Sequence, residues 1–429
     1  MRLHTPQKTD RILETLAPPA GPKTKNCAKG AGSISSAIKS AAAKDIPLEA
    51  LRGIAAIIVV LNHSIVAFLP QYYGLGPIRA GGPQSLLGDL RYVFINGTAA
   101  VCLFFVLSGY VLTRRYCLSG DTGILLKGAV KRWPRLMGPV LVTVLISYAL
   151  FYFHLYHFQQ AGAASGSTWL SLFGNGFFRF FAPALTVAQI HLRGALEQGI
   201  FLVFFRGDVV FDSSLWTMRP EFLGSLIAFG AAPILLEARK SSKSITIGLA
   251  ALIVVLLHFA APNLEAFPIG TAMAVLLPRN AVLPRTIAYP AILVSLYLLG
   301  YPSQAVGAYT AFGWLIAAGM PATDPMILGA ALMICTVETF PPIRRLFSGR
   351  LPAALGQLSF PVYLLHVLVI CSTGSAVYLR HGAIPAIVTV FIVTTVAALP
   401  LVWFNNFWVA RVNAGAAFVL RPRGHHTPL

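Results

Sequence analysis

Long apolar runs recur along this chain from Ile46 almost to the C-terminus, and they constrain its fold more than any other feature. Only 11% of the 429 residues are charged, whereas a soluble globular domain carries about 25%. A water-facing surface cannot be built from so few charges, so the expected solvent is lipid. The sequence therefore predicts an all-α fold, a polytopic transmembrane helical bundle.

The apolar runs and their bounding charges predict about ten membrane spans. Residues 266–340 are the difficult part, because they contain four shorter apolar pieces broken by Pro278, Pro290, Pro302 and Pro321. Three spans there would place Arg344 and Arg345 in the cytoplasm, as the positive-inside rule favours, whereas four would place them outside. We therefore expect three, with both termini inside. The clearer spans are 48–69, 94–113, 137–158, 219–237, 244–261, 355–378 and 384–409.

The distribution of the net charge of +19 is typical of a membrane protein rather than of a nucleic-acid-binding protein. Its basic residues fall in the N-terminal tail and in short clusters between apolar runs, as positive-inside topology produces. No nucleic-acid-binding module is apparent. The five cysteines are an odd count without CxxC spacing, so neither a disulfide framework nor a zinc site is indicated. We expect a disordered basic cytoplasmic tail (1–45), a transmembrane domain (46–410) and a short basic C-terminal tail (411–429).

Arg52 and His63 lie on the first apolar run, which carries no other charge between them. Eleven residues of α-helix turn through about 1100°, only about 20° past three full turns, so both side chains share one face. They are offset along the axis by about 16 Å. Each residue could simply snorkel to its own membrane interface. The functional alternative is that both face a cavity, as ionisable groups in membrane helices usually do.

A second feature is the segment SLWTMRPEF, residues 214–222, which enters a long apolar run. Pro220 suits the first turn of a helix, and Glu221 then lies near its positive end. A carboxylate there is held ionised beside a basic partner. An ordinary helix-start acid paired with Arg219 is the competing interpretation.

Two further stretches carry polar groups among apolar residues. In FFVLSGY, Ser108 and Gly109 permit the close approach of another backbone. Near the C-terminus, Tyr363 and His366 stand at i,i+3 and can meet on one helix face. An ordinary buried histidine explains the latter pair nearly as well as a site does. Between the spans, five basic residues on one predicted cytoplasmic loop could bind phosphates, although topology alone would also place them there: Arg114, Arg115, Lys131, Arg132 and Arg135.

The segment 159–215 mixes Gly, Ser and Phe with isolated charges and is expected to lie outside the membrane. Its partly apolar stretches suggest a re-entrant or interfacial arrangement. A lid or acceptor platform and a plain surface loop are equally consistent with it.

Taken together, these motifs resemble the acyltransferase-3 family of membrane O-acyltransferases. The resemblance covers roughly residues 46–405 in the family's order. WTMRPEF replaces the commoner WSLSVEE, so the second acid of that motif is missing, and nothing after residue 410 matches the SGNH domain that some members carry. The matching positions are Arg52 and His63, Phe104–Gly109, Arg132 and Arg135, Trp216 and Glu221, and Gly356, Ser359, Tyr363 and His366.

The resemblance implies transfer of an acyl group, expected to be acetyl, from cytoplasmic acyl-CoA to a hydroxyl of an exported or surface polysaccharide or glycolipid. The enzyme class would be acyltransferases that transfer groups other than amino-acyl groups, in the cell membrane, with polysaccharide export machinery as a candidate partner. No permanently bound cofactor is expected. His63 would be the general base, or would carry the acyl group, and Glu221 would orient it. Supporting residues would be Ser108, Trp216, Tyr363 and His366, and donor-binding residues Arg52, Arg114, Arg115, Arg132 and Arg135.

Other chemistry finds less support in the sequence. A soluble serine hydrolase would need a GxSxG elbow, which does not occur. Metal chemistry lacks a clustered set of His and carboxylates, so no metal site is expected. A proton-coupled transporter of a small solute stays open, because an Arg–His–Glu set in helices can relay protons. Macrolide, lipid and peptidoglycan acceptors also stay open.

Overall fold

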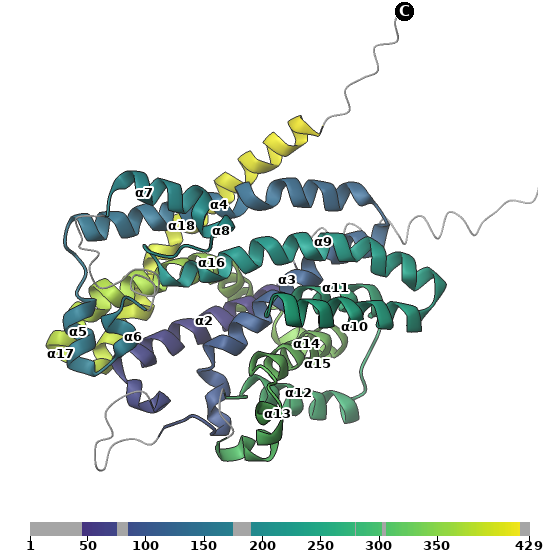
Figure 1. Ribbon diagram of the computed structural model, residues 1–429, viewed down its shortest axis with the longest axis horizontal. Coiled ribbons are helices and arrows are strands. Elements are labelled where there is room, and N and C mark those ends of the chain that lie inside the picture. The colour runs from purple at the N-terminus through teal and green to yellow at the C-terminus, as the bar shows by residue number, and fades with distance from the viewer. Residues whose placement is uncertain (1–44, 75–84, 175–189, 279, 303–305, 421–429) are drawn as a thin grey trace, which may run out of the picture. The chain divides into compact units, whose positions relative to one another are not determined.

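The computed structural model describes residues 45–74, 85–174, 190–278, 280–302 and 306–420, all within the compact unit Lys44–Leu429. Residues 1–44, where the basic tail is predicted, lie outside the described part. Every regular element that is described is helical, which confirms the all-α class (Figure 1). The N-terminal half contains α2 (Ile46–Phe68), η1 (Pro70–Tyr73), η2 (Leu90–Phe94), α3 (Gly97–Ser119), α4 (Thr122–Tyr152), α5 (Phe158–Ser165), α6 (Thr168–Ser171), α7 (Leu192–Glu197), η4 (Gln198–Leu202) and α8 (Val203–Phe205). The C-terminal half contains η5 (Ser213–Thr217), α9 (Met218–Ser241), α10 (Lys243–Ala260), α11 (Ala266–Leu276), α12 (Arg285–Leu299), η6 (Gly307–Phe312), α13 (Gly313–Ala317), α14 (Thr323–Thr339), α15 (Pro341–Leu346), α16 (Arg350–Val369), η7 (Ile370–Gly374), α17 (Ser375–His381) and α18 (Ala383–Val419).

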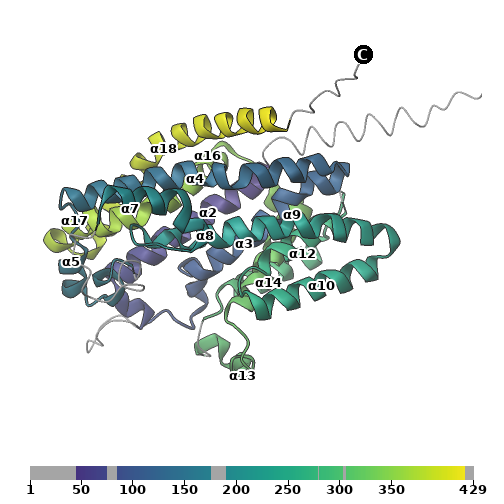
Figure 2. The same cartoon turned by 45° about the horizontal axis from the view of Figure 1, so that its top comes forward.

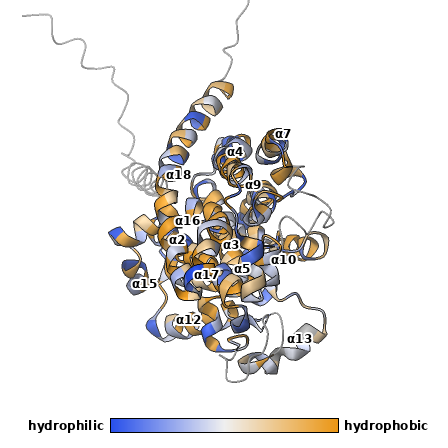
Figure 3. Ribbon diagram, turned by 90° about the vertical axis from the view of Figure 1, so that its left-hand side faces the viewer, coloured by the Kyte–Doolittle hydropathy of each residue, from blue (hydrophilic) through white to orange (hydrophobic). Residues whose placement is uncertain are grey.

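Seven helical segments in the described residues are long and apolar enough to cross a membrane. Apolar residues dominate these helices in the hydropathy colouring of Figure 3. They correspond to the seven clear predicted spans, so the membrane bundle is confirmed. The difficult stretch 266–340 contains the shorter helices α11, α12 and α14. Whether each of these three crosses the membrane stays a prediction.

The helix α4 corrects the predicted arrangement of the basic residues. A cytoplasmic loop was expected around Lys131–Arg135, yet α4 begins at Thr122 and continues through Pro134 and Pro139. Asp121 caps its start by accepting a hydrogen bond from the Gly123 N–H at 2.9 Å. Proline and charge favour a loop locally, but tertiary packing overrides such preferences. Arg132 and Arg135 therefore project from a helix of the bundle.

The central helix α2 packs against α16 on one side and α3 on another (Figures 1 and 2). Glycines bring α2 and α16 into backbone contact, because a Cβ added at Gly53 would lie 2.6 Å from Leu355 and one at Gly356 would lie 2.6 Å from Glu49. The predicted close approach at Gly109 is also found, since a Cβ there would lie 2.1 Å from the Phe267 carbonyl oxygen of α11. Close packing thus holds α2 and α3 in a fixed register with their neighbours.

Two regions differ from the predicted boundaries. In the described part of segment 159–215 the chain forms short helices rather than an irregular loop, whereas residues 175–189, with Arg179, lie outside the described residues. The helix α18 continues past residue 410 to Val419, so the predicted C-terminal tail begins as helix. In Figure 1 this end of α18 projects away from the neighbouring helices.

Candidate functional site at the two ends of helix α2

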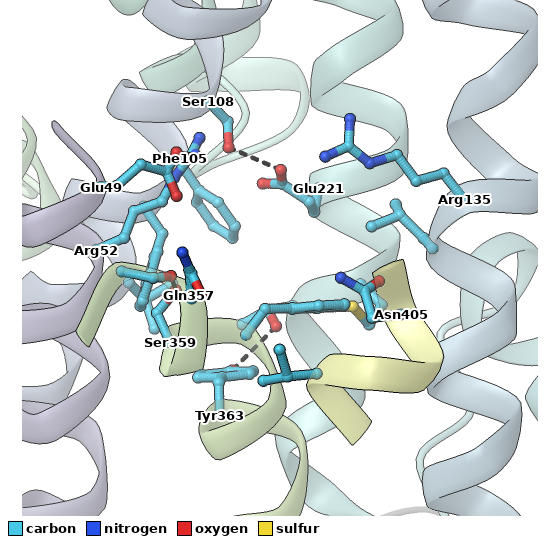
Figure 4. Close-up of a pocket in the computed structure, with 18 of the residues that line it drawn as sticks. Glu49, Arg52, Phe105, Ser108, Arg135, Glu221, Gln357, Ser359, Tyr363 and Asn405 are labelled. Carbon is cyan, nitrogen blue, oxygen red and sulfur yellow. Dashed lines mark hydrogen bonds and ion pairs between the residues drawn. The ribbon is translucent and has the colours of Figure 1, made fainter. Parts of the chain in front are cut away.

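A cavity of about 220 Å³ opens between α2, α3, α4, α9, α16 and α18. Figure 4 shows charged side chains at one end of this cavity and Tyr363 of α16 at the other. Six helices far apart in the sequence thus converge on one polar space. The charged and hydroxyl groups of that end are Glu49, Arg52, Ser108, Arg132, Arg135 and Glu221.

The Arg132–Glu221 ion pair forms the buried part of this end. Arg132 is 7% exposed, and Ser108 Oγ donates a hydrogen bond of 2.7 Å to Glu221 Oε1. Burying two charges is costly unless each is paired and hydrogen-bonded. The remaining Arg132 Nε–H is buried and has no hydrogen-bond partner among the described residues. Ser108 therefore helps to hold the ion pair in place, and the Arg132 Nε–H is left as an unpaired donor.

Arg52 and Arg135 complete a group of three guanidinium groups around the cavity. Arg52 Nη1 binds Glu49 Oε1 at 2.6 Å, one turn earlier on α2. Arg135 is exposed and has no ion pair among the described residues. Glu49 was not among the predicted site residues, although its i,i+3 spacing from Arg52 signals such a pair.

The other two predicted donor-binding arginines do not line the cavity. Arg114 binds Glu338, its guanidinium carbon stands 5.1 Å from the centre of the Tyr110 ring, and Arg344 joins the same network at 2.6 Å from Glu338. Arg114 thus contributes to an ion-pair network between α3, α14 and α15. Arg115 is exposed, within electrostatic range of Lys131 on α4.

His63 lies at the opposite end of α2, and hydrogen bonding and ring stacking hold its imidazole in place. His63 Nδ1 lies 2.7 Å from His366 Nε2, and His366 Nδ1 lies 2.6 Å from the carbonyl oxygen of Tyr363. The Trp169 ring of α6 stacks on His63 with 4.9 Å between centroids. Trp169 was not among the predicted site residues; it belongs to segment 159–215, for which a lid and a plain surface loop were equally consistent.

The direction of this hydrogen-bond chain follows from its last acceptor. A carbonyl oxygen can only accept, so His366 Nδ1 carries the proton and donates it. In neutral His366 the Nε2 atom is then the acceptor, and His63 Nδ1–H is the donor. Neutral His63 consequently carries its lone pair on Nε2, for which no hydrogen-bond partner is found in the described residues. An imidazole in this state can accept a proton from a substrate.

The predicted role of Glu221 needs a correction. Glu221 was expected to orient His63, yet it binds Arg132 and Ser108 in the cavity, whereas His366 binds His63. The physical reason is the buried guanidinium of Arg132, which needs a carboxylate partner more than a neutral imidazole does. The expected alignment of Arg52 and His63 does hold, because α2 is continuous from Ile46 to Phe68.

Tyr363 connects the two ends of the site. It lines the cavity, and its ring centre lies 5.6 Å from that of His366. Its hydroxyl donates to the Ser214 carbonyl oxygen at 3.0 Å and contacts Thr217 Oγ1 at 2.9 Å, which fixes α16 against η5. Trp216, which belongs to the segment SLWTMRPEF, is 43% exposed and does not line the cavity.

Several polar lining residues were not singled out from the sequence: Thr217, Gln357, Asn405 and Asn406. The two adjacent amides in the last apolar run were a usable signal, because polar residues inside membrane helices usually face a cavity. Thr217 and Gln357 belong to the motifs considered but carry no charge that would distinguish them.

Comparison with known families identifies the domain to which these residues belong. The family model described as "Acyltransferase domain", of the acyltransferase-3 family, matches residues 46–403. Searches of the curated proteins and of the solved structures found no significant match. The matched range begins with α2 and ends within α18, so it includes both ends of the site. The chain therefore belongs to the acyltransferase-3 family of membrane acyltransferases.

Proposed function

We propose that this protein transfers an acyl group, acetyl in the simplest case, from cytoplasmic acyl-CoA to a hydroxyl of an exported or surface polysaccharide or glycolipid. The observation that carries the proposal is the hydrogen-bond chain from His63 through His366 to the Tyr363 carbonyl, which leaves His63 Nε2 as a base. His63 lies on α2, and the same helix lines the cavity that contains three arginines. The N-terminus and the guanidinium end would face the cytoplasm.

The arginine end suits the donor. Phosphate groups are recognised by guanidinium groups, and Arg135 has its charge available because no ion pair occupies it in the described residues. Exposed Arg115 and partly buried Lys131 would extend this positive surface toward the nucleotide. A cavity of about 220 Å³ is below the roughly 300–1,000 Å³ of ordinary ligand pockets. It would therefore hold the pantetheine arm and leave the nucleotide outside.

The histidine end suits the chemical step. His63 Nε2 would take the proton of the acceptor hydroxyl as its oxygen attacks the thioester carbonyl. The carbon–sulfur bond then breaks, and His63 passes the proton to the leaving sulfur, so CoA departs as the thiol. In the alternative route, Nε2 attacks the thioester carbonyl first and the CoA thiolate leaves. The acyl group then passes to the acceptor oxygen, whose proton is taken up by the CoA thiolate, and His63 is regenerated. His366 acts in both routes as a positioning residue, because it fixes which nitrogen of His63 carries the lone pair.

The separation of the two ends matches the length of the donor. Arg52 and His63 are offset by about 16 Å along α2, comparable to an extended pantetheine arm. The arm would pass Phe104 and Tyr363, whose ring centres stand 5.9 Å apart. Donor and acceptor would then be bound at opposite sides of the membrane. The family assignment favours acyl transfer over proton-coupled transport.

Mass spectrometry of surface glycans tests the proposed function. Cells lacking the protein would be compared with cells that carry the wild-type chain, His63→Ala, or the control His381→Ala, whose histidine is exposed on α17. We expect acyl groups on the glycan with the wild type and the control only. Equal acylation with His63→Ala would refute the catalytic role. Solute or proton transport by the purified chain in liposomes without acyl-CoA consumption would support a transporter instead.

A further inference from the structure

Three ligand-type side chains meet away from the proposed acyl-transfer site. His258 lies near the end of α10, Glu265 directly precedes α11, and Asp324 is in the first turn of α14. One potential ligand atom from each lies within 4.8 Å of the others. The three helices are neighbours in Figure 1. The fold thus assembles a cluster that the sequence did not indicate.

Glu265 is the unusual member of this cluster. It is 3% exposed, and neither of its carboxylate oxygens has a hydrogen-bond partner among the described residues. A buried carboxylate is costly unless a positive charge or hydrogen-bond donors compensate it. The buried and unpaired carboxylate is therefore suited to bind a cation.

We propose that His258, Glu265 and Asp324 bind a divalent transition-metal ion, with Zn²⁺ as the best fit. One imidazole nitrogen and two carboxylate oxygens form a ligand set that suits such ions. A point equidistant from three atoms 4.8 Å apart lies about 2.8 Å from each, and zinc–ligand bonds measure about 2.0–2.2 Å. Each ligand atom would therefore move inward by less than about 1 Å. Water would complete the coordination.

The metal would act as a clamp at this end of the bundle. It would join the turn between α10 and α11 to the start of α14, which is distant in the sequence. The close contact between Gly109 and Phe267 places α11 against α3, the helix that carries Ser108 of the cavity. Sequence spacing predicts no metal site, because His258, Glu265 and Asp324 come from three separate segments of the chain.

Metal content of the purified full-length chain tests this site. The protein would carry a tag without histidine, be stripped with EDTA, dialysed against Zn²⁺ and then against buffer, and analysed by mass spectrometry of the metal. A His425→Ala/His426→Ala background removes the adjacent histidine pair of the tail, which could bind Zn²⁺ by itself. We expect one retained Zn²⁺ per chain and a higher thermal unfolding midpoint.

The variants separate metal binding from folding. Glu265→Gln removes the charge but keeps the size, so this variant should unfold at a higher temperature than wild type in EDTA. It should also lose the retained Zn²⁺ and the stabilisation by Zn²⁺. Glu237→Gln, at an exposed glutamate of α9, is the matched control and should retain both. No retained Zn²⁺ in the wild type, or equal retention in Glu265→Gln, would overturn the proposal.

Discussion

The two ends of helix α2 use different physical means to prepare a site. At the Arg52 end, charges are held in pairs: buried Arg132 with Glu221, and half-buried Arg52 with Glu49. At the His63 end, the proposed acyl-transfer site consists of neutral rings joined by directional hydrogen bonds. Pairing avoids an uncompensated buried ion and leaves Arg135, which has no ion pair among the described residues, to attract a charged donor. At the other end a fixed tautomer prepares one nitrogen as a base.

This difference explains why the two ends respond differently to mutation. Removing one member of an ion pair leaves a charge uncompensated, so the cost appears as lost stability. Removing a link in the histidine chain leaves no charge behind, so the cost should appear mainly in the rate of the chemical step. The predictions below use that distinction.

Glu221→Ala should have the largest effect on folding. It leaves buried Arg132 without its carboxylate, which costs about 3–5 kcal/mol of stability. Thermal unfolding of the purified chain in detergent would measure this loss. Glu237→Ala, at an exposed glutamate of the same helix, should change little.

A double variant separates stability from function at this end. Arg132→Met/Glu221→Leu replaces both charges with apolar groups of similar size, which is often neutral for folding. We expect its unfolding temperature to return near that of wild type while acyl-CoA binding stays weakened. Wild-type donor affinity in this folded double variant would show that the ion pair serves only the fold.

His366→Ala should affect the rate and leave the fold largely intact. A hydrogen bond to a group that becomes charged contributes about 1.5–3 kcal/mol, which corresponds to roughly a 10–100-fold decrease in kcat. The KM for acyl-CoA should stay unchanged, because His366 does not line the cavity. In His366→Gln the amide oxygen can accept from His63 Nδ1–H, so part of the rate should return. A changed KM without a changed kcat would argue against positioning.

Substitution of Asp212 should have the smallest and most specific effect, which is on the pH dependence of stability. Burial raises the pKa of this carboxyl to about 7, although the hydrogen bond from Ser214 N–H lowers it. The folded state therefore holds a proton that the unfolded state releases, and this stabilisation is lost as pH rises through 7. Between pH 6 and 8 the loss amounts to about 1 kcal/mol.

Asp212→Asn keeps the oxygen that accepts from Ser214 N–H but cannot ionise. Relative to wild type, the variant should therefore gain stability as the pH is raised from 6 to 8. Unfolding midpoints at both pH values would measure this gain. A difference that is independent of pH would contradict the assignment.

The sequence was sufficient for the helices and for the residues at both ends, but not for their pairing. Apolar length predicts α2, α3 and α16 because lipid exposure leaves a strong compositional signal. The partners of Glu221 and His63 depend on which helices are neighbours, and single-sequence patterns do not contain that information. Local prolines and charges misled the prediction at α4, where packing maintains the helix past Pro134.

Measurements of donor binding and acyl transfer in two single variants test the division of the site between the two ends of α2. Acetyl-CoA affinity would be measured by calorimetry, and acyl transfer by mass spectrometry, for purified Arg135→Gln and His63→Ala. The account predicts that Arg135→Gln weakens acetyl-CoA binding about tenfold, whereas His63→Ala binds the donor normally and transfers nothing. Normal binding by Arg135→Gln together with lost binding by His63→Ala would contradict the division of the site along α2.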